Sequence, residues 1–392
     1  METAPIRLLR ITTVPISLRL LITGQPRFMT QHGMDVMLCS ADGPEVKAVE
    51  DYEGCHHSVI PFTRAITPVQ DLRCLWQLVQ FMRRYTPDIV HTHTPKAGLL
   101  GMVAARLTGI KVRVHTVAGL PYMTAGGKKR RLLIMMEKIT YWAAAHVWPN
   151  SQGLYKEIVD QGLCPASKLD IISHGSTNGI DLQQFSSDAI SATIDRKIKK
   201  DIGYRPDCRY LIVIGRLVRD KGILELLEAF EQLHKALPDV RLLLLGPLEE
   251  ERAEEILPGD AVRRLKEHPA ITHVPWTDEV AVYLRLADLL IHPSHREGFP
   301  NVLLQAGAMN CPIICSQIAG NVDIVTHEKT GLTFPAGDAV ALLDRMEYAL
   351  QHHAEMSRMA DTLRQQVQQR YDREVIHRCL LHRYQELMNQ VD

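Results

Sequence analysis

The stretch His292-Pro-Ser-His-Arg-Glu-Gly-Phe-Pro-Asn-Val-Leu-Leu-Gln305 joins an expected strand to an expected helix. The apolar run 287–291 before it is typical of a short buried strand. A turn is expected at Glu297–Phe299, and Pro300 stands where a helix would begin, a position at which the missing N–H of proline costs nothing. The helix is expected to end at Asn310, because a proline follows two residues later.

The start of this helix is a candidate site for phosphate. The N–H groups of Asn301, Val302 and Leu303 are expected to lack acceptors within the helix, and the helix end carries a partial positive charge. Glu297 does not fit a phosphate site, because a carboxylate repels phosphate. We therefore expect Glu297 to accept hydrogen bonds from sugar or ribose hydroxyls, or to act as a counter-charge at a reacting centre.

The composition is that of an ordinary globular protein. The chain has 392 residues, of which 46% are hydrophobic and 23% charged, and about 150 residues per domain gives two domains. Lys+Arg and Asp+Glu balance at 45 each, so no overall positive field attracts nucleic acid. The start lacks the pattern of a signal peptide, the eight cysteines form no C-x-x-C pair, and the apolar runs are too short to cross a bilayer. A cytoplasmic protein that at most touches a membrane is expected.

Apolar segments of strand length alternate with segments of helical periodicity in both halves of the chain. Residues 6–11 and 35–39 are expected strands in the first half, and residues 210–215 and 240–246 are expected strands in the second. This alternation predicts two α/β halves, each a parallel sheet covered by helices on both faces. Ligands of such sheets bind outside the carboxyl ends of the strands, so the cleft between the halves is the expected site.

Four segments are expected along the chain. The pattern weakens into polar and charged residues before the second half, and the last segment carries one apolar stripe that predicts a helix. The expected segments are a first domain at 1–190, a linker at 191–206, a second domain at 207–370 and a helix at 371–392 that packs back on the first domain.

A second phosphate-seeking element is Gly215-Arg216-Leu-Val-Arg-Asp-Lys221-Gly222, which lies between an expected strand and an expected helix. The guanidinium of Arg216 suits two phosphate oxygens, and the ammonium of Lys221 adds a movable point charge. The alternative is a solvated basic loop.

These motifs carry a resemblance to a known family. The Arg216 and Lys221 loop, with Glu297-Gly-Phe-Pro-Asn-Val and an amide at Gln305, resembles the family 4 glycosyltransferases of the GT-B fold. The segments His91–Gly98, Thr116–Pro121 and Ser176–Asp181 look like the capsular and O-antigen polysaccharide branch. The resemblance covers nearly the whole chain. It implies two Rossmann-like domains that face a cleft, with a C-terminal helix crossing back to the first domain.

The resemblance also implies an activity. Family members transfer a sugar from a nucleotide-diphosphate sugar with retention of the anomeric configuration, without a metal or other cofactor. The donor is expected to be a UDP-sugar, and Arg216 and Lys221 would hold its diphosphate and stabilise the leaving group. Glu297 would lie near the donor sugar. Backbone groups of the following residues would reach the sugar and phosphate: Gly298, Phe299, Pro300, Asn301 and Val302.

Two positions depart from the family pattern. Gln305 stands where the family commonly has a second glutamate that contacts the ribose, and its amide still accepts a hydrogen bond, though a weaker one. A structural glutamine on the helix surface is the alternative. Ala118 stands where many relatives have a histidine near the transferred sugar. His115 is then a candidate on the sugar side, and a buried histidine with no contact to substrate is the alternative.

Further single residues have weaker assignments. Gly24 is expected to let the backbone approach the diphosphate, or to be a simple turn glycine. His91 and His93 share one face of a strand end, but no third ligand has suitable spacing, so no metal is expected. Trp276 is expected to pack, with stacking on the donor base as the alternative.

A cluster of cations suggests how the acceptor is held. Lys128, Lys129, Arg130 and Arg131 precede an apolar helix, which suggests contact with anionic lipid or a polyprenyl diphosphate at the inner face of the membrane. Lys96 is a further candidate on the acceptor side. The alternative is a solvated loop that leads into a buried helix.

The combined interpretation is a hexosyl- or N-acetylhexosaminyl-transferase that acts on a lipid-linked or oligosaccharide acceptor in surface polysaccharide biosynthesis. Two other functions remain open. One is a nucleotide-sugar 2-epimerase of the same fold, which would need a positioned acid and base. The other is a nucleotide-sugar-binding protein that lost catalysis together with the glutamate at position 305.

Overall fold

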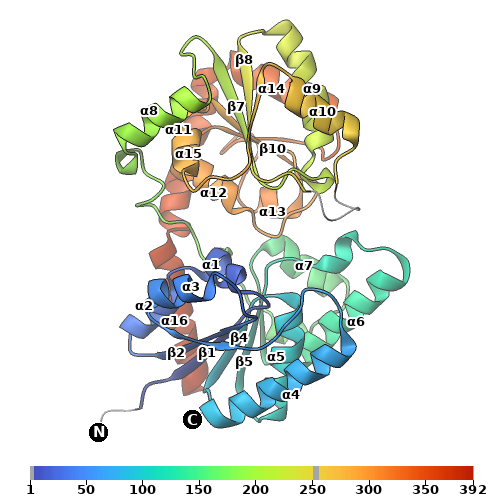
Figure 1. The fold of residues 1–392 in the computed structure, drawn as a ribbon, viewed down its shortest axis with the longest axis vertical. Coiled ribbons are helices and arrows are strands. Elements are labelled where there is room, and N and C mark those ends of the chain that lie inside the picture. The colour runs from blue at the N-terminus through green and yellow to red at the C-terminus, as the bar shows by residue number, and fades with distance from the viewer. Residues whose placement is uncertain (1–3, 250–255, 392) are drawn as a thin grey trace. The chain divides into compact units, whose positions relative to one another are not determined.

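A computed structural model describes residues 4–249 and 256–391 and divides into two compact units (Figure 1). Unit 1 runs to Asn178 and also includes the segment from Arg373 onward, whereas unit 2 comprises Gly179–Asp372. The N-terminal stretch was expected to lack a signal peptide, and its first residues, 1–3, lie outside the described residues. Among the residues described, no helix combines the length and apolar character needed to cross a bilayer.

Unit 1 is built on six parallel strands in the order β3-β2-β1-β4-β5-β6. The order reverses between β1 and β4, which pair with Leu9 opposite Val90. This reversal is the switch point where doubly wound sheets bind ligands. The strands are β1 (Arg7–Ile11), β2 (Asp35–Ser40), β3 (His56–Val59), β4 (Ile89–Thr92), β5 (Val112–Val117) and β6 (His146–Pro149).

Helices cover both faces of this sheet. Leu9 and its neighbours pack under α4, α5 and α6, while Leu8 faces α1, α2 and α16 on the other side. Successive residues of a strand thus enter different cores, which explains why the strands are apolar throughout. The helices are α1 (Pro15–Ile22), α2 (Gln25–Gln31), α3 (Val46–Glu53), α4 (Pro68–Tyr85), α5 (Pro95–Leu107), α6 (Gly127–Ala143), α7 (Gln152–Asp160) and α16 (Arg373–Asn389), with a short 3₁₀ turn at Pro121–Thr124.

Unit 2 repeats the plan with six parallel strands in the order β12-β11-β10-β7-β8-β9. Its switch point lies between β7 and β10, where Leu211 is opposite Leu289. The strands are β7 (Arg209–Ile214), β8 (Val240–Leu245), β9 (Ile271–Val274), β10 (Leu289–His292), β11 (Ile313–Ser316) and β12 (Leu332–Phe334). The helices are α8 (Ala192–Asp201), α9 (Ile223–Ala236), α10 (Gly259–Glu267), α11 (Val280–Leu286), α12 (Asn301–Ala308), α13 (Ala319–Val322), α14 (Ala339–Gln351) and α15 (His353–Arg370).

The linker predicted at residues 191–206 is wrong, because this segment contains helix α8 and belongs to unit 2. Its charges hide a stripe of Ile194, Ile198 and Ile202 at spacings of four, which packs into the unit 2 core. The boundary lies at Asn178, so the first domain ends before 190 and the second begins before 207.

The predicted return of the last helix is confirmed. Helix α16 belongs to unit 1 and lies beside α2 (Figure 1). Its residues Leu380, Tyr384 and Leu387 are buried in the core under β1 and β2. The C-terminal segment is therefore part of the first Rossmann-like domain.

Candidate active site

The two motifs that the sequence singled out meet at the switch point of unit 2. Strands β7 and β10 are neighbours, and the loops that follow them lead into α9 and α12. The loops are bonded to each other, because the N–H of His295 donates to the Asp220 carbonyl at 2.8 Å and Nε of Arg296 donates to the Asp220 carboxylate at 2.8 Å. Topology thus brings together two segments more than seventy residues apart in the chain.

Gly222 is what permits this close approach. Its φ of +66° is in the left-handed region, and a Cβ at this position would lie 2.1 Å from the carbonyl oxygen of Pro293. Any other residue would push the loop after β10 away from the loop after β7.

Lys221 and Glu297 form an ion pair at this junction. The Lys221 ammonium donates to Oε1 of Glu297, and Oγ of Ser294 donates to the same oxygen at 2.8 Å. Nε2 of His292, the last residue of β10, lies 3.0 Å from it at an angle poorer than that of a regular hydrogen bond. One carboxylate oxygen therefore holds three neighbours in place.

Glu297 is an ionised carboxylate with one open oxygen. Burial alone raises the pKa of Glu297, but the contact with His292 and the charge of Lys221 outweigh burial and leave the pKa well below the usual range. Its side chain keeps 15% of its exposure. Within the described parts of the chain, Oε2 has no recorded partner. This oxygen is an acceptor suited to a ligand hydroxyl.

The start of α12 offers fewer donors than the sequence predicted. The N–H of Leu303 donates to the Pro300 carbonyl at 3.1 Å, so the prediction of a free amide at Leu303 is wrong. Pro300 is the N-cap of α12 rather than its first residue. In the part of the chain that the structure describes, no acceptor is recorded for the amides of Asn301 and Val302. These two N–H groups remain at the positive end of the helix.

Phe299 and Gly298 have structural contacts. The Phe299 side chain is buried, with its ring centroid 5.5 Å from that of Tyr371. Only the backbone of Phe299 is therefore left to contact a ligand. A Cβ added at Gly320 would lie 2.7 Å from the Gly298 carbonyl oxygen, which shows how tightly α13 supports this turn. Pro300 has no N–H to donate.

Arg216 does not join the ion pair of Lys221. Its Nη1 lies 3.3 Å from Oε2 of Glu249, and its side chain is 42% exposed. Both cations come from the connection between β7 and α9, but only Lys221 is held near Glu297. The roles predicted for both in phosphate binding stay predictions.

Gln305 and Trp276 have side chains open to ligands. Gln305 is partly buried on α12, and no hydrogen bond of its amide is recorded with the described residues. A capping role for the amide therefore has no support. Trp276 follows β9 and is 61% exposed, so the prediction that it packs is wrong. Stacking of the indole on the donor base stays a prediction.

The sequence missed four residues that hold this site together. They are Asp220, His292, Ser294 and Arg296, which lie within the two motifs but received no role. Their position at the ends of two strands was visible in the sequence. Which of them face each other depends on the pairing of β7 with β10.

Two candidates for the sugar or acceptor side are buried in unit 1 instead. Lys96 is 7% exposed, and its ammonium binds Asp71 at 2.7 Å, Thr63 at 3.0 Å and the Ala65 carbonyl. It fixes the loop before α4, so the acceptor assignment is corrected. A lysine in the first turn of a helix reaches back over the preceding loop, which the motif did not reveal.

His115 also faces the core. Its Nδ1 bonds Thr92 at 2.7 Å, its ring packs 6.1 Å from that of Tyr141, and a Cβ at Gly98 would lie 2.4 Å from the ring. Burial lowers its pKa to about 4. The assignment of His115 to the sugar side is therefore corrected, because the structure shows a buried and neutral histidine.

Gly24 does not lie in the loop that follows β1, because helix α1 stands between that loop and Gly24. Gly24 is instead the N-cap residue of α2, with a φ of +82°. Its N–H donates to Oε1 of Glu53 at 2.8 Å. The expected approach of this amide to a diphosphate is therefore corrected, because the amide already has an acceptor inside unit 1.

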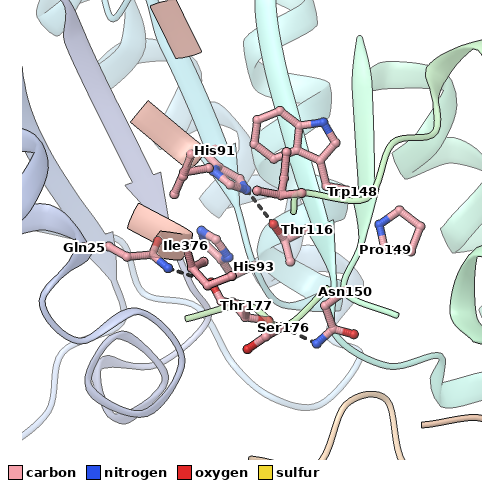
Figure 2. A pocket seen from close by; sticks show the side chains of 12 residues that line it. Gln25, His91, His93, Thr116, Trp148, Pro149, Asn150, Ser176, Thr177 and Ile376 are labelled. Carbon is pink, nitrogen blue, oxygen red and sulfur yellow. Dashed lines mark hydrogen bonds between the residues drawn. The ribbon is translucent and has the colours of Figure 1, made fainter. Parts of the chain in front are cut away.

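A buried polar network connects β1, β4 and α16 on one face of unit 1. Arg10 is fully buried and donates to Nε2 of His93 at 2.8–3.1 Å, to Gln25 at 2.6 Å and to Tyr384 at 3.2 Å. Because arginine only donates, His93 must carry its proton on Nδ1. Figure 2 shows His93 beside Gln25 and Thr177 in a small cavity with room for about one water molecule.

The predicted histidine pair is present, and three of its four ring nitrogens bond to the protein, whereas Nδ1 of His93 is buried with no recorded partner among the described residues. The rings of His91 and His93 are tilted against each other, with their centroids 4.1 Å apart. His91 bonds Tyr384 at 2.5 Å and Thr116 at 2.7 Å, and Figure 2 shows the contact with Thr116. Among the described residues, no group of three or more potential ligands is placed to hold a metal ion. The network fastens α16 to the sheet.

The predicted basic cluster opens helix α6. Lys128, Lys129 and Arg131 are exposed, whereas the guanidinium of Arg130 lies 5.6 Å from the centroid of the Tyr122 ring. None of the four enters the cavity of Figure 2. Their expected contact with an acceptor stays a prediction.

Two doubly wound α/β domains in one chain are the plan of the GT-B proteins. Residues 27–175 match the family model described as Glycosyl transferase 4-like domain, and residues 170–366 match that described as Glycosyl transferases group 1.

Known proteins agree with this class. The chain is 30% identical over 91% of its length to the capsular polysaccharide biosynthesis glycosyltransferase CapM of Staphylococcus aureus, covering 91% of that protein. It is 25% identical to the UDP-Gal:alpha-D-GlcNAc-diphosphoundecaprenol alpha-1,3-galactosyltransferase of Escherichia coli, covering 79% of the chain and 78% of that enzyme. The fold matches Anabaena Alr3699/HepE, solved in complex with UDP and glucose, at a TM-score of 0.78 and 15% identity, over 97% of this chain and 100% of that one.

The chain belongs to the group 1 glycosyl transferases, the family 4 enzymes of the GT-B fold, in the branch that builds capsules and related polysaccharides. It is a glycosyltransferase of polysaccharide biosynthesis.

Proposed function

We propose that unit 2 binds a nucleotide-diphosphate sugar, a UDP-sugar, and that the enzyme transfers its sugar with retention of configuration to a lipid-linked or saccharide acceptor held by unit 1. The observation that carries this proposal is the Lys221–Glu297 pair at the carboxyl ends of β7 and β10. The transfer uses no metal and no other cofactor, because protein cations take the place of a metal at the diphosphate.

Different residues of the site bind different parts of the donor. Lys221 and the amides of Asn301 and Val302 supply positive charge for the diphosphate. Oε2 of Glu297 is open to a sugar hydroxyl, and the amide of Gln305 is open to the ribose. The relative from Escherichia coli is named for a UDP-Gal donor and a diphosphoundecaprenol acceptor, which supports both a UDP-sugar and a lipid-linked acceptor here.

The chemistry follows from this arrangement. The bond between the anomeric carbon and the diphosphate oxygen breaks, negative charge builds on the departing nucleotide, and the acceptor oxygen forms the new bond on the same face. The acceptor proton leaves with the diphosphate. Lys221 stabilises charge that exists only as the leaving group departs, so its contribution appears in the rate rather than in ground-state binding alone.

A panel of nucleotide sugars tests the donor. We expect UDP-sugars to raise the unfolding temperature more than GDP- or dTDP-sugars, because a ligand at about 100 times its Kd stabilises the folded state by about 2.7 kcal/mol. A shift with another nucleotide and none with UDP-sugars would overturn the choice of base. No shift with any of them would overturn the donor site.

The same donor distinguishes a transferase from a 2-epimerase. The carboxylate at the switch point of unit 2 is Glu297, and a carboxylate whose pKa lies well below the usual range is a poor base for removing a ring proton. UDP-N-acetylglucosamine incubated without acceptor is therefore expected to keep its configuration at C2. Formation of the 2-epimer, followed by NMR, would overturn the transferase proposal.

Gln305 gives a separate prediction about the ribose contact. Because its amide has no recorded partner among the described residues, Gln305→Glu is expected to change the donor KM by less than about tenfold and to leave kcat within about twofold. Gln365→Glu, on the exposed side of α15, is the matched control. A silent wild-type protein that gains activity only with Gln305→Glu would show that the chain is a degenerate binding protein.

A further inference from the structure

The loop that carries Glu297 is bonded to two elements that follow it in the chain, β11 and α13. Ser316 is the last residue of β11, and Asn321 lies in the short helix α13. Both side chains are fully buried, as is that of Ser294 in the loop after β10. Buried polar side chains must find hydrogen-bond partners inside the protein, so the partners of these three indicate what they do.

The three side chains form a row of hydrogen bonds that ends on Glu297. Nδ2 of Asn321 donates to the carbonyl oxygen of Ser316 at 2.9 Å and to its Oγ at 3.1 Å. The Ser316 hydroxyl donates to the carbonyl oxygen of Ser294. The Ser294 hydroxyl donates to Oε1 of Glu297 at 2.8 Å. This relay, Asn321–Ser316–Ser294, connects α13 to the carboxylate at the switch point of unit 2.

The amide of Asn321 sets the direction of the Ser316 hydroxyl. An NH2 group only donates, so the hydroxyl accepts from Asn321 and gives its own proton to Ser294. The amide cannot be turned round, because its oxygen would then face the Ser316 carbonyl oxygen. Oδ1 of Asn321 is buried with no recorded partner among the described residues, which lowers the stability of the fold. The observed orientation therefore orders the Ser316 hydroxyl but leaves the amide's own oxygen unbonded.

The Ser294 hydroxyl has three possible acceptors for its one proton. Its Oγ lies 2.8 Å from Oε1 of Glu297, 3.3 Å from the Arg296 carbonyl oxygen and 3.4 Å from the Asp220 carbonyl oxygen. A fixed Ser294 peptide keeps Oγ nearest the carboxylate, where the hydrogen bond is charge-assisted and therefore strongest. Because Oε1 is bound by both Ser294 and Lys221, the direction of Oε2 is fixed as well.

Helix α13 also contacts the Glu297 turn through its backbone. A Cβ added at Gly320 would lie 2.7 Å from the carbonyl oxygen of Gly298 and 2.8 Å from that of Glu297. The turn thus packs directly on the residue before Asn321. Because glycine leaves the two backbones in direct contact, a shift of α13 is transmitted to the turn.

We propose that Asn321 and Ser316 are positioning residues of the donor site. They fix the Ser294 peptide, and through Ser294 they aim Oε2 of Glu297 at a hydroxyl of the donor sugar. This role rests on the proposed function, because the aim of Glu297 matters only if Glu297 faces the sugar. A misplacement of about 1 Å near a reacting centre lowers the rate by about 10²-fold, so loss of the relay is expected to appear in kcat.

Kinetics of sugar transfer and binding of UDP, both measured on the full chain, test the role. The donor is the UDP-sugar that raises the unfolding temperature most. Ser316→Ala is expected to lower kcat by about tenfold or more. The Kd of UDP is expected to stay within about twofold of wild type, because UDP lacks the sugar that Glu297 contacts.

Thr333→Val is the matched control. Thr333 is buried in β12, the strand next to β11, and its hydroxyl bonds His327 at 3.2 Å. This variant also loses one buried hydroxyl, but the lost bond is outside the relay, so kcat is expected to stay within about twofold of wild type.

A double variant tests whether the two residues act as a unit. Asn321→Ala is expected to lower kcat in the same way as Ser316→Ala. Once Ser316→Ala has broken the relay, adding Asn321→Ala is expected to lower kcat by less than about twofold more. Circular dichroism and unfolding temperature show which variants fold. If Asn321→Ala does not fold, Ser316→Ala and its control decide the role alone.

The positioning role is overturned if Ser316→Ala keeps the kcat of wild type, or if Thr333→Val lowers kcat as much. It is also overturned if the affinity for UDP falls together with kcat, which would indicate a general loosening of unit 2, or if the two alanine variants have additive effects. Failure of the proposed function gives a different result, because wild type itself would then bind no UDP. The positioning role would fall with it.

Discussion

Replacing Lys221 with alanine is expected to lower kcat/KM for sugar transfer by well over tenfold, which corresponds to a loss of about 1.5–3 kcal/mol of charge-assisted bonding. Among the residues that the structure describes, the Lys221 ammonium is the lysine or arginine cation held against Glu297 at the switch point of unit 2. Removing it takes positive charge from the leaving diphosphate and leaves Glu297 partly buried without a counter-ion. Initial rates with a donor and acceptor pair, fitted for kcat and KM separately, measure the effect.

Two arginines in the same loop as Lys221 give variants for comparison with Lys221→Ala. Arg216→Ala is expected to lower kcat/KM by more than about tenfold as well, mainly through donor KM, because the Arg216 side chain is exposed and lies outside the contact between Lys221 and Glu297. Arg219→Ala, in the same turn but bonded to the Ile256 carbonyl at 2.8 Å, is expected to stay within about twofold of wild type. Wild-type rates in the Lys221 and Arg216 variants would refute the assignment of this loop to phosphate.

Lys221→Ala should also change the pH profile. The charge of Lys221 is one of the causes that lower the pKa of Glu297. Without that charge the pKa of Glu297 rises, so the acid limb of kcat/KM is expected to move to higher pH. A residual activity with an unmoved acid limb would show that Glu297 is not required as a carboxylate.

Acid is expected to unfold unit 1 well before ordinary acid denaturation. Burial lowers the pKa of four histidines in this unit: His91 and His93 well below 6.5, His115 to about 4 and His377 to about 3. The folded unit keeps them neutral, whereas the unfolded chain binds protons below about pH 6.5. Their stabilisation is therefore complete above that pH and is lost as pH falls toward the folded values, by about 2 kcal/mol per histidine at about pH 5.

Thermal unfolding between about pH 7.5 and about pH 5 measures this loss. The slope of unfolding free energy against pH should correspond to several protons, and His115→Gln should reduce it by about 1.4 kcal/mol per pH unit. His56→Gln, on the exposed edge strand β3, is the control that leaves the slope unchanged. A flat stability from neutral pH to about pH 5 would contradict neutral burial of the four rings.

The pattern of the chain predicted the fold to a large extent. Alternating apolar strands and periodic helices predicted two parallel sheets, and both are present with helices on their two faces. The stripe of α16 predicted its packing. The prediction of a linker failed because α8 is mostly charged. The helix is held by three isoleucines, which are too few to stand out in a polar segment.

The candidate site was predicted unevenly. Lys221 and Glu297 were both singled out, and the structure places them in contact with each other. Lys96 and His115 were singled out by the same kind of motif, yet Lys96 holds Asp71 and His115 packs beside Gly98. A motif records which residue types stand near a strand end. It does not record which side of the sheet each side chain faces.

The sequence alone determined the class of enzyme and the two-domain plan, and it predicted the stretch His292–Gln305 as a wall of the donor site. Only the tertiary structure decided which partners meet there. Glu297 is ionised because the pairing of β7 with β10 brings Lys221 and His292 to one of its oxygens. The strand order that creates this contact depends on packing between segments far apart in the chain, and no local pattern contains that information.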